Sequence, residues 1–123
     1  GYEVVDKGAF SSESVDYPDI ALAVAKSVAD EETDAGILLC GTGIGMSIAA
    51  NKVDGIRAAL CHDKETAALS RQHNDANVLA VGARINSIEN ILDIVDTWLE
   101  EKFLGDRHKR RVEKIMAIEK ENS

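Results

Sequence analysis

The chain has 123 residues, of which 45% are hydrophobic and 4% aromatic, and its formal net charge is −8. This length suits one domain with one core, and the acidic balance argues against general binding to nucleic acid. No apolar run is long enough to span a bilayer, and two cysteines are too few for the disulfide framework of a secreted protein. We therefore expect a single domain over residues 1–123, in a reducing compartment such as the cytoplasm.

Strand and helix patterns alternate along the chain. Short β-branched or apolar runs predict strands at residues 2–8, 35–41, 56–63 and 77–83, and the run 35–41 lacks the alternation of a strand with one solvated face. After a polar loop at residues 11–18, helices are expected at 19–30, 44–53, 64–73 and 88–99 and in the last segment, 106–123. Asp63 and Ser87 are positioned to cap two of them.

The apolar residues of the last two helices predict which faces are buried. The stripe on residues 88–99 consists of Ile88, Ile91, Leu92, Val95, Trp98 and Leu99, and the stripe on the last helix of Val112, Ile115 and Met116. Alternating strands and helices predict an α/β fold, a Rossmann-like three-layer arrangement with a mostly parallel sheet. Ligands of such sheets bind beyond the carboxyl ends of the strands.

The motif "LLCGTGIGMS", residues 38–47, lies at such an end. Gly41, Gly43 and Gly45 allow close backbone approach, and the N–H groups that precede the next helix can hold an anion or a developing oxyanion. Close packing of helix on strand explains the glycines equally well. Cys40 is either a thiolate that acts as base or nucleophile, or a buried inert residue. Cys61 ends a similar strand without such a loop, and we expect it to be inert.

Histidines and arginines supply the other candidates. His73 lies between a helix and a buried strand, near the carboxyl ends or in the loop that leads into the sheet, and either acts in acid–base chemistry or only helps to end the helix. Arg84 follows another strand. Arg107 and Arg111 are four residues apart, so they share a helix face that suits a phosphate group, although pairing with surface carboxylates is the alternative. The spacing of Cys and His does not match a zinc site.

Four stretches together resemble type B ribose-5-phosphate isomerases, a family that also includes the galactose-6-phosphate isomerase subunits. These stretches are "VDYPD", "GILLCGTGIGMSIAANKVDGIRAALCHD", "HNDANVLAVGAR" and "GDRHKRRV", and they occur in order over nearly the whole chain. The resemblance implies an enzyme that interconverts ribose 5-phosphate and ribulose 5-phosphate through a cis-enediolate. It implies no metal and no organic cofactor.

The resemblance also implies roles for individual residues. Cys40 matches the base that moves a proton between C2 and C1, and Met46 stands where some members carry a glutamate base. Thr42 matches a hydroxyl group among the oxygens of the sugar. His73 matches the group that protonates the ring oxygen, and Asn74 a neighbour that binds the sugar. The enediolate is stabilised by the loop that contains Gly41, Gly43, Ile44 and Gly45, and the phosphate by Arg84, Arg107 and Arg111.

In this family the arginines of the last helix come from the other subunit, so the resemblance implies an obligate homodimer with shared active sites. The C-terminal helix, residues 106–123, is then expected to reach the partner, and whether dimers pair into tetramers stays open. Family members begin with a further strand and helix, and their sheet is expected in the order 2-1-3-4-5. Because this chain starts at what looks like the second strand, we expect residues 2–8 to lack a ladder partner and the sheet to open at its centre. We therefore expect a fragment that folds poorly or is inactive alone.

Other functions remain to be distinguished by experiment. A galactose-6-phosphate enzyme divides its site between two kinds of subunit, whereas Cys40, His73 and the arginines occur here in one chain. Allose 6-phosphate needs the same chemistry with one more carbon. The alternative from another class is a module that binds a sugar phosphate without catalysis.

Overall fold

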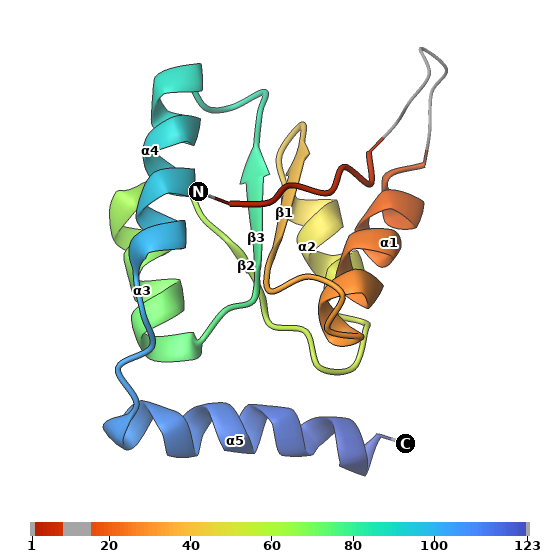
Figure 1. Ribbon diagram of the computed structural model, residues 1–123, viewed down its shortest axis with the longest axis vertical. Coiled ribbons are helices and arrows are strands. Elements are labelled where there is room, and N and C mark those ends of the chain that lie inside the picture. The colour runs from red at the N-terminus through yellow and green to blue at the C-terminus, as the bar shows by residue number, and fades with distance from the viewer. Residues whose placement is uncertain (1, 9–15, 123) are drawn as a thin grey trace.

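The structure, a computed structural model, describes residues 2–8 and 16–122 (Figure 1). The polar stretch at residues 11–15 lies outside the described residues. The elements follow in the order α1 (Tyr17–Ala29), β1 (Gly36–Cys40), α2 (Ile44–Ala50), β2 (Ala58–Leu60), α3 (Lys64–Asn74), β3 (Val78–Gly82), α4 (Ile88–Glu100) and α5 (Asp106–Glu121). This alternation of strands and helices confirms the predicted α/β class.

The described strands form one parallel sheet in the order β1-β3-β2. Strand β3 pairs with β1 over five residues and with β2 over three. The order 2-1-3-4-5 would have placed residues 58–60 beside residues 36–40, and this detail was wrong because β3 lies between them. All five residues of β3 are buried, whereas those of the short β2 are only partly buried. The strand that is buried on both faces therefore takes the central position.

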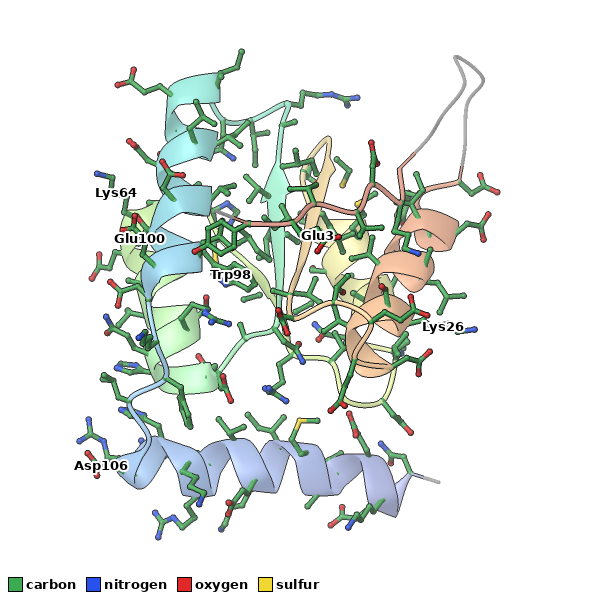
Figure 2. All side chains as sticks on the ribbon, in the orientation of Figure 1. Glu3, Lys26, Lys64, Trp98, Glu100 and Asp106 are labelled. Carbon is green, nitrogen blue, oxygen red and sulfur yellow. The ribbon has the colours of Figure 1, made fainter. Side chains whose placement is uncertain are left out.

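Helices cover both faces of the sheet (Figure 1). Helices α1 and α2 pack on one face, where Leu38 and Ala80 meet Ala21, Ala25 and Met46 in one hydrophobic cluster. Helices α3 and α4 pack on the other face. There Trp98, which lies between α4 and the sheet in Figure 2, joins a second cluster with Leu79, Val81, Ile94 and Ala67. The three layers agree with the Rossmann-like arrangement predicted from the sequence.

Local sequence signals fix where several helices begin. Asp63 accepts a hydrogen bond from the backbone N–H of Thr66 at 2.8 Å and forms a capping box, and the side chain of Ser87 accepts one from the N–H of Asn90. Both predicted caps are confirmed. Helix α1 begins two residues before the predicted start, because Pro18 occupies its first turn, where a missing N–H costs nothing.

Two predicted strand features were wrong. Residues 2–7 form no strand: their side chains are exposed, although the Tyr2 hydroxyl donates to the carbonyl of Leu99 at 3.4 Å. Among the described residues no strand pairs with them, which agrees with the expected lack of a ladder partner. In β1, Ile37 and Leu39 are 37% and 50% exposed, so one face of this strand is open to solvent. The reason is that the α3–α4 layer lies over β3 and does not extend over β1.

The buried faces of the last two helices also differ from the prediction. On α4, Ile94 and Trp98 are fully buried, whereas Ile88 and Leu92 are 78% and 58% exposed. The stripe is thus rotated towards Ile94, and the predicted members that pack against the core are Trp98, Ile91, Val95 and Leu99. Helix α5 buries His108 and Val112, but Ile115 is 45% exposed.

Helix α5 lies across the amino ends of the strands, below the sheet in Figure 1. It contacts α3, and the Glu119 carboxylate accepts a hydrogen bond from the N–H of Gly55 at 2.8 Å, just before β2. The carboxyl ends of the strands, where Cys40 is found, lie at the opposite side of the sheet.

Candidate active site

The loop after β1 holds Cys40 in a defined polar setting. Cys40 is partly buried, and its sulfur accepts a hydrogen bond from the backbone N–H of Gly43 at 3.2 Å. The Thr42 hydroxyl accepts one from the N–H of Ile44 at 3.3 Å. A backbone N–H aimed at a sulfur suits a thiolate better than a thiol, because the anion is the stronger acceptor. The turn therefore presents a partly buried sulfur with a backbone donor aimed at it.

Two glycines of this loop are required by close packing. Gly43 has a φ of +81°, and a Cβ atom there would lie 2.6 Å from Cδ1 of Leu60 and 3.0 Å from the carbonyl carbon of Val81. A Cβ atom at Gly45 would lie 2.5 Å from the ring of Tyr17. The loop is thus held between the ends of β2 and β3 on one side and the start of α1 on the other.

The segment after β3 joins the same loop. The N–H of Ala83 donates to the carbonyl of Cys40, at 2.6 Å, and the N–H of Arg84 donates to the carbonyl of Gly41, at 2.9 Å. The Arg84 guanidinium lies against Gly41, with its central carbon 3.4 Å from the place of a Cβ atom there. The structure thus brings together Cys40, Thr42, the loop glycines, Ile44 and Arg84 at the carboxyl ends of the strands, with a cation beside the thiol loop.

A second group of candidates lies elsewhere. His73 and Asn74 end α3, and Arg107 and Arg111 are exposed on the first turns of α5. The ring of His73 stacks on that of His108, with centroids 4.1 Å apart and planes inclined by 12°. This group therefore combines histidine rings and two guanidinium groups at the junction of α3 and α5.

The two groups are separated by the length of the sheet. Helix α3 ends at the amino end of β3, and α5 lies across that same end, whereas Cys40 and Arg84 follow the carboxyl ends of β1 and β3. At roughly 3.3 Å per residue, a five-residue strand keeps the groups at least about 13 Å apart. His73 therefore lies in the last turn of α3, on the side from which the chain enters the sheet, and not near the carboxyl ends, which was the other position predicted. Within one chain it does not meet Cys40.

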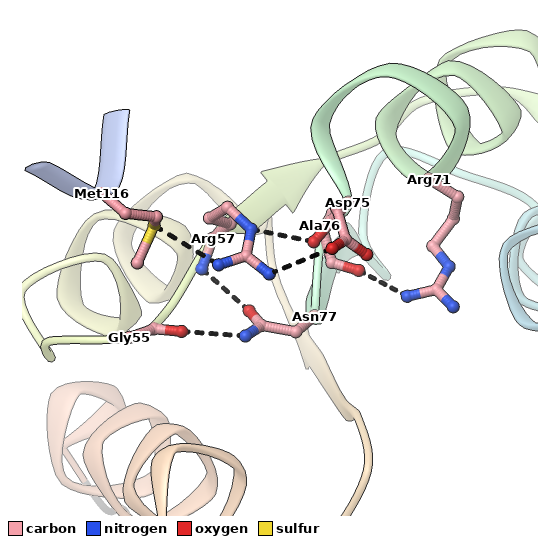
Figure 3. Close-up of polar contacts among 7 residues, drawn as sticks. All are labelled: Gly55, Arg57, Arg71, Asp75, Ala76, Asn77 and Met116. Atoms are coloured by element: carbon pink, nitrogen blue, oxygen red, sulfur yellow. Dashed lines mark hydrogen bonds and ion pairs between the residues drawn. The ribbon is translucent and has the colours of Figure 1, made fainter. Parts of the chain in front are cut away.

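Arg57 contacts both the residue that follows α3 and helix α5, the two helices that carry the second group (Figure 3). Its side chain donates to the carbonyl of Asp75 at 2.9 Å and to the sulfur of Met116 on α5 at 3.3 Å, and it lies 3.7 Å from the Asp75 carboxylate. Asn77 bonds to the backbone N–H of Arg57 and to the carbonyl of Gly55. The residue after Asn74 is thereby linked to the helix that carries the arginines.

Cys61 is placed very differently from Cys40. It is 1% exposed within the core between α3, α4 and the sheet, and burial raises the pKa of its thiol, against the hydrogen bonds of Ser70 and Thr66. A thiol with a raised pKa has little thiolate at neutral pH, and thiolate is the reactive form. The prediction that Cys61 is inert agrees with this setting.

Thiol labelling is expected to separate the two cysteines. At neutral pH, a maleimide or disulfide reagent should modify Cys40 in the folded protein, and Cys61 only after unfolding in denaturant. Mass spectrometry of the labelled peptides provides the measurement. Labelling of Cys61 at the same rate as Cys40 in the folded protein would contradict the assigned burial.

Sequence reasoning missed two residues that the structure places next to the candidates, Tyr17 and His108. Tyr17 contacts Gly45, and a signal for it existed: a helix that precedes a parallel strand runs against it, so its first residue lies at the carboxyl ends. His108 lies between Arg107 and Arg111 in the sequence. From the sequence alone it cannot be distinguished from the solvated basic residues around it.

Within residues 2–8 and 16–122, no helix is long and apolar enough to cross a membrane. Over the same residues, no three side chains of His, Cys, Asp or Glu gather as they would around a metal ion.

Comparison with known proteins agrees with this geometry. Ribose-5-phosphate isomerase B of Escherichia coli is 57% identical over 119 residues, 97% of this chain and 80% of that protein. The structure matches ribose-5-phosphate isomerase B of Clostridium thermocellum with a TM-score of 0.97 and 57% identity, covering 99% of this chain and 82% of that one. The enzyme of Mycoplasma genitalium, solved with bound ribulose 5-phosphate, matches with a TM-score of 0.93 and 46% identity, covering 98% of this chain and 80% of that one. Residues 1–115 match the family described as Ribose/Galactose Isomerase, and the chain belongs to that family.

Proposed function

We propose that the protein interconverts ribose 5-phosphate and ribulose 5-phosphate, with Cys40 as the base. The observation that carries this proposal is the polar turn at the end of β1, in which the N–H of Gly43 faces the Cys40 sulfur and Arg84 lies beside Gly41. Relatives that bear the name of this enzyme are more than half identical to the chain, and one relative holds ribulose 5-phosphate.

Cys40 is proposed to move one proton. The thiolate takes the proton from C2 of the open-chain aldose, which gives a cis-enediolate, and the thiol returns it to C1, while the hydroxyl proton passes from O2 to O1. Met46, buried to 4% exposure after the loop, has no group that could take the proton instead. We propose no cofactor, because proton transfer next to a carbonyl needs only a base and donors for the oxyanion.

The loop supplies those donors. The N–H of Gly43 already faces the sulfur and that of Ile44 faces the Thr42 hydroxyl, so the remaining amides between Gly41 and Gly45 would bind the enediolate oxygens. Thr42 is exposed and its hydroxyl can reach the hydroxyl groups of the sugar. Fixed donors at the place where charge develops are commonly worth about 3–4 kcal/mol in transition-state stabilisation.

The second group would prepare and hold the substrate. His73 donates a proton to the ring oxygen as the C1–O4 bond of the furanose breaks, and the C1 hydroxyl proton leaves to water, which yields the aldehyde. Asn74 binds a hydroxyl group of the sugar, and Arg84, Arg107 and Arg111 bind the phosphate. A sugar phosphate must contact both groups, and a length of strand separates them within one chain.

We therefore propose a homodimer in which each site takes Cys40 and Arg84 from one copy and the α3–α5 group from the other. Exposed apolar side chains near the base and on the last helix, Ile44, Ile48, Ile115 and Ile118, supply surface that a second copy could cover. A twofold dimer then has two equivalent shared sites. Both cysteines of the chain are free thiols, which fits a reducing compartment such as the cytoplasm.

A substrate panel tests the proposed function. Ribose 5-phosphate, allose 6-phosphate and galactose 6-phosphate are incubated with the protein, and the ketose formed is measured. We expect the highest kcat/KM for ribose 5-phosphate, and preference for a hexose phosphate would assign the protein to the other substrate class of the family. If calorimetry shows binding of ribose 5-phosphate but no sugar is turned over, the protein is a binding module and not an enzyme.

A further inference from the structure

His73 and His108 form a stacked pair that the reaction described above uses only in part. His73 lies in the last turn of α3 and His108 in the first turn of α5, and their ring planes are inclined by only 12° with centroids 4.1 Å apart. His73 is half-buried, whereas His108 is 8% exposed. The His73 ring is therefore the more exposed of the two, and it packs on the buried ring of His108.

Backbone contacts fix the geometry of this pair from both sides. The N–H of Leu104 donates to the carbonyl of Gln72 at 3.0 Å, and the side chain of Gln72 donates to the Glu101 carboxylate at 2.7 Å. Gly105 then turns the chain with a φ of +74°, and its carbonyl accepts the N–H of His108. The start of α5 is thus attached to the residue before His73, and the two rings have little freedom to slide.

Burial and neighbouring basic groups disfavour the charged form of His108. Burial lowers the pKa of His108 first, and the neighbouring His73 lowers it further. Arg107 and Arg111 act in the same direction, whereas Asp106 opposes them. With its charged form disfavoured, His108 offers a flat ring face to His73.

We propose that His108 is a positioning residue for ring opening: its stacked ring holds the His73 imidazole in the orientation from which it protonates the furanose oxygen of a substrate bound by the other copy. This inference rests on the proposed isomerase function. His108 itself touches no reacting atom. Its contribution is to remove the rotational freedom of His73, which is otherwise a partly exposed side chain at the end of a helix.

The chemistry of the two sugars provides a test that isolates this step. Ribose 5-phosphate is a furanose and needs ring opening, whereas ribulose 5-phosphate cannot close a ring because its O5 carries the phosphate. Exchange of a C1 hydrogen of ribulose 5-phosphate with D2O requires Cys40 and the enediolate but no ring opening. Turnover of ribose 5-phosphate depends on both steps. Comparison of the two rates therefore separates the base from the ring-opening group.

The variants are H108F, which keeps a flat ring, and H108L, which fills similar space without one. For H108L we expect kcat with ribose 5-phosphate to fall about tenfold or more while C1 exchange, followed by NMR, stays within about threefold of the unmodified protein. H108F should recover most of the lost turnover. Circular dichroism and thermal melts establish that both variants are folded.

Each other result counts against the proposal. Equal turnover of H108F and H108L, or lower turnover of H108F, would overturn a role based on ring stacking. Loss of C1 exchange in step with turnover in H108L would assign His108 a structural role only. If the unmodified protein shows neither turnover nor exchange, the proposed function fails, and this outcome is distinct from a failure of the His108 inference.

Discussion

Replacement of Cys40 by alanine is expected to lower kcat for ribose 5-phosphate by about 10²–10⁴-fold, the usual contribution of a positioned general base. The sulfur is the group that the N–H of Gly43 faces, and neither Met46 nor Thr42 can take its place as a base at neutral pH. Binding of the substrate should change little, because alanine removes no contact to the phosphate. Steady-state kinetics with ribose 5-phosphate, and calorimetry with an unreactive sugar phosphate, measure the two effects.

The matched control is Cys61→Ala, which removes the other thiol of the chain. Cys61 is 1% exposed in the core between α3, α4 and the sheet, so its loss should leave kcat near that of the unmodified protein. A Cys40→Ala protein that retains full turnover would exclude Cys40 as the base. A Cys61→Ala protein that loses turnover while it stays folded would show that the reactive thiol is Cys61 and not Cys40.

Much of the fold was predictable because its signals are local. The carboxylate of Asp63 and the hydroxyl of Ser87 define the starts of two helices through hydrogen bonds that span three residues. The apolar run at residues 77–83 predicted a buried strand, and all five residues of β3 are buried. Cys40 lies at the carboxyl end of a strand, where the alternation of strands and helices had placed it.

The rest depends on contacts that no local pattern specifies. Strand order is decided by which apolar strand is best covered by the helices of both layers, and this put β3 between β1 and β2. The exposure of Ile37 and Leu39 has the same origin, since their sequence is as apolar as that of β3 but no described helix lies over them. The burial of Ile94 in place of Ile88 and Leu92 reflects where α4 meets the sheet.

The candidate site shows the same division. Its carboxyl-end half, with Cys40 and Arg84, follows from strand ends that can be found in the sequence. The position of His73 could also be predicted, because a helix that precedes a parallel strand must end at the amino end of that strand. The stack of His73 on His108 could not be predicted, because it requires the turn at Gly105 that brings α5 beneath α3.

The shared site leads to the second large effect, which is recovery of activity from two inactive proteins. A Cys40→Ala chain keeps the α3–α5 group, and a chain with Arg107→Ala and Arg111→Ala keeps the base. Each variant alone should have both of its sites defective. In a dimer with one chain of each kind, one site combines the intact Cys40 with the intact arginines, and the other carries both defects.

Measurement of this mixed dimer tests the central claim most directly. The two variants are produced together with different affinity tags, the dimer that carries both tags is isolated, and its turnover of ribose 5-phosphate is compared with that of the unmodified protein. Dimers of two differently tagged Cys40→Ala chains serve as the control and should stay inactive. We predict that the mixed dimer has about half the activity of the unmodified dimer, from one intact site of two. Activity no higher than that of the two separate variants would show that the base and the arginines do not meet across two copies, and would contradict the shared site.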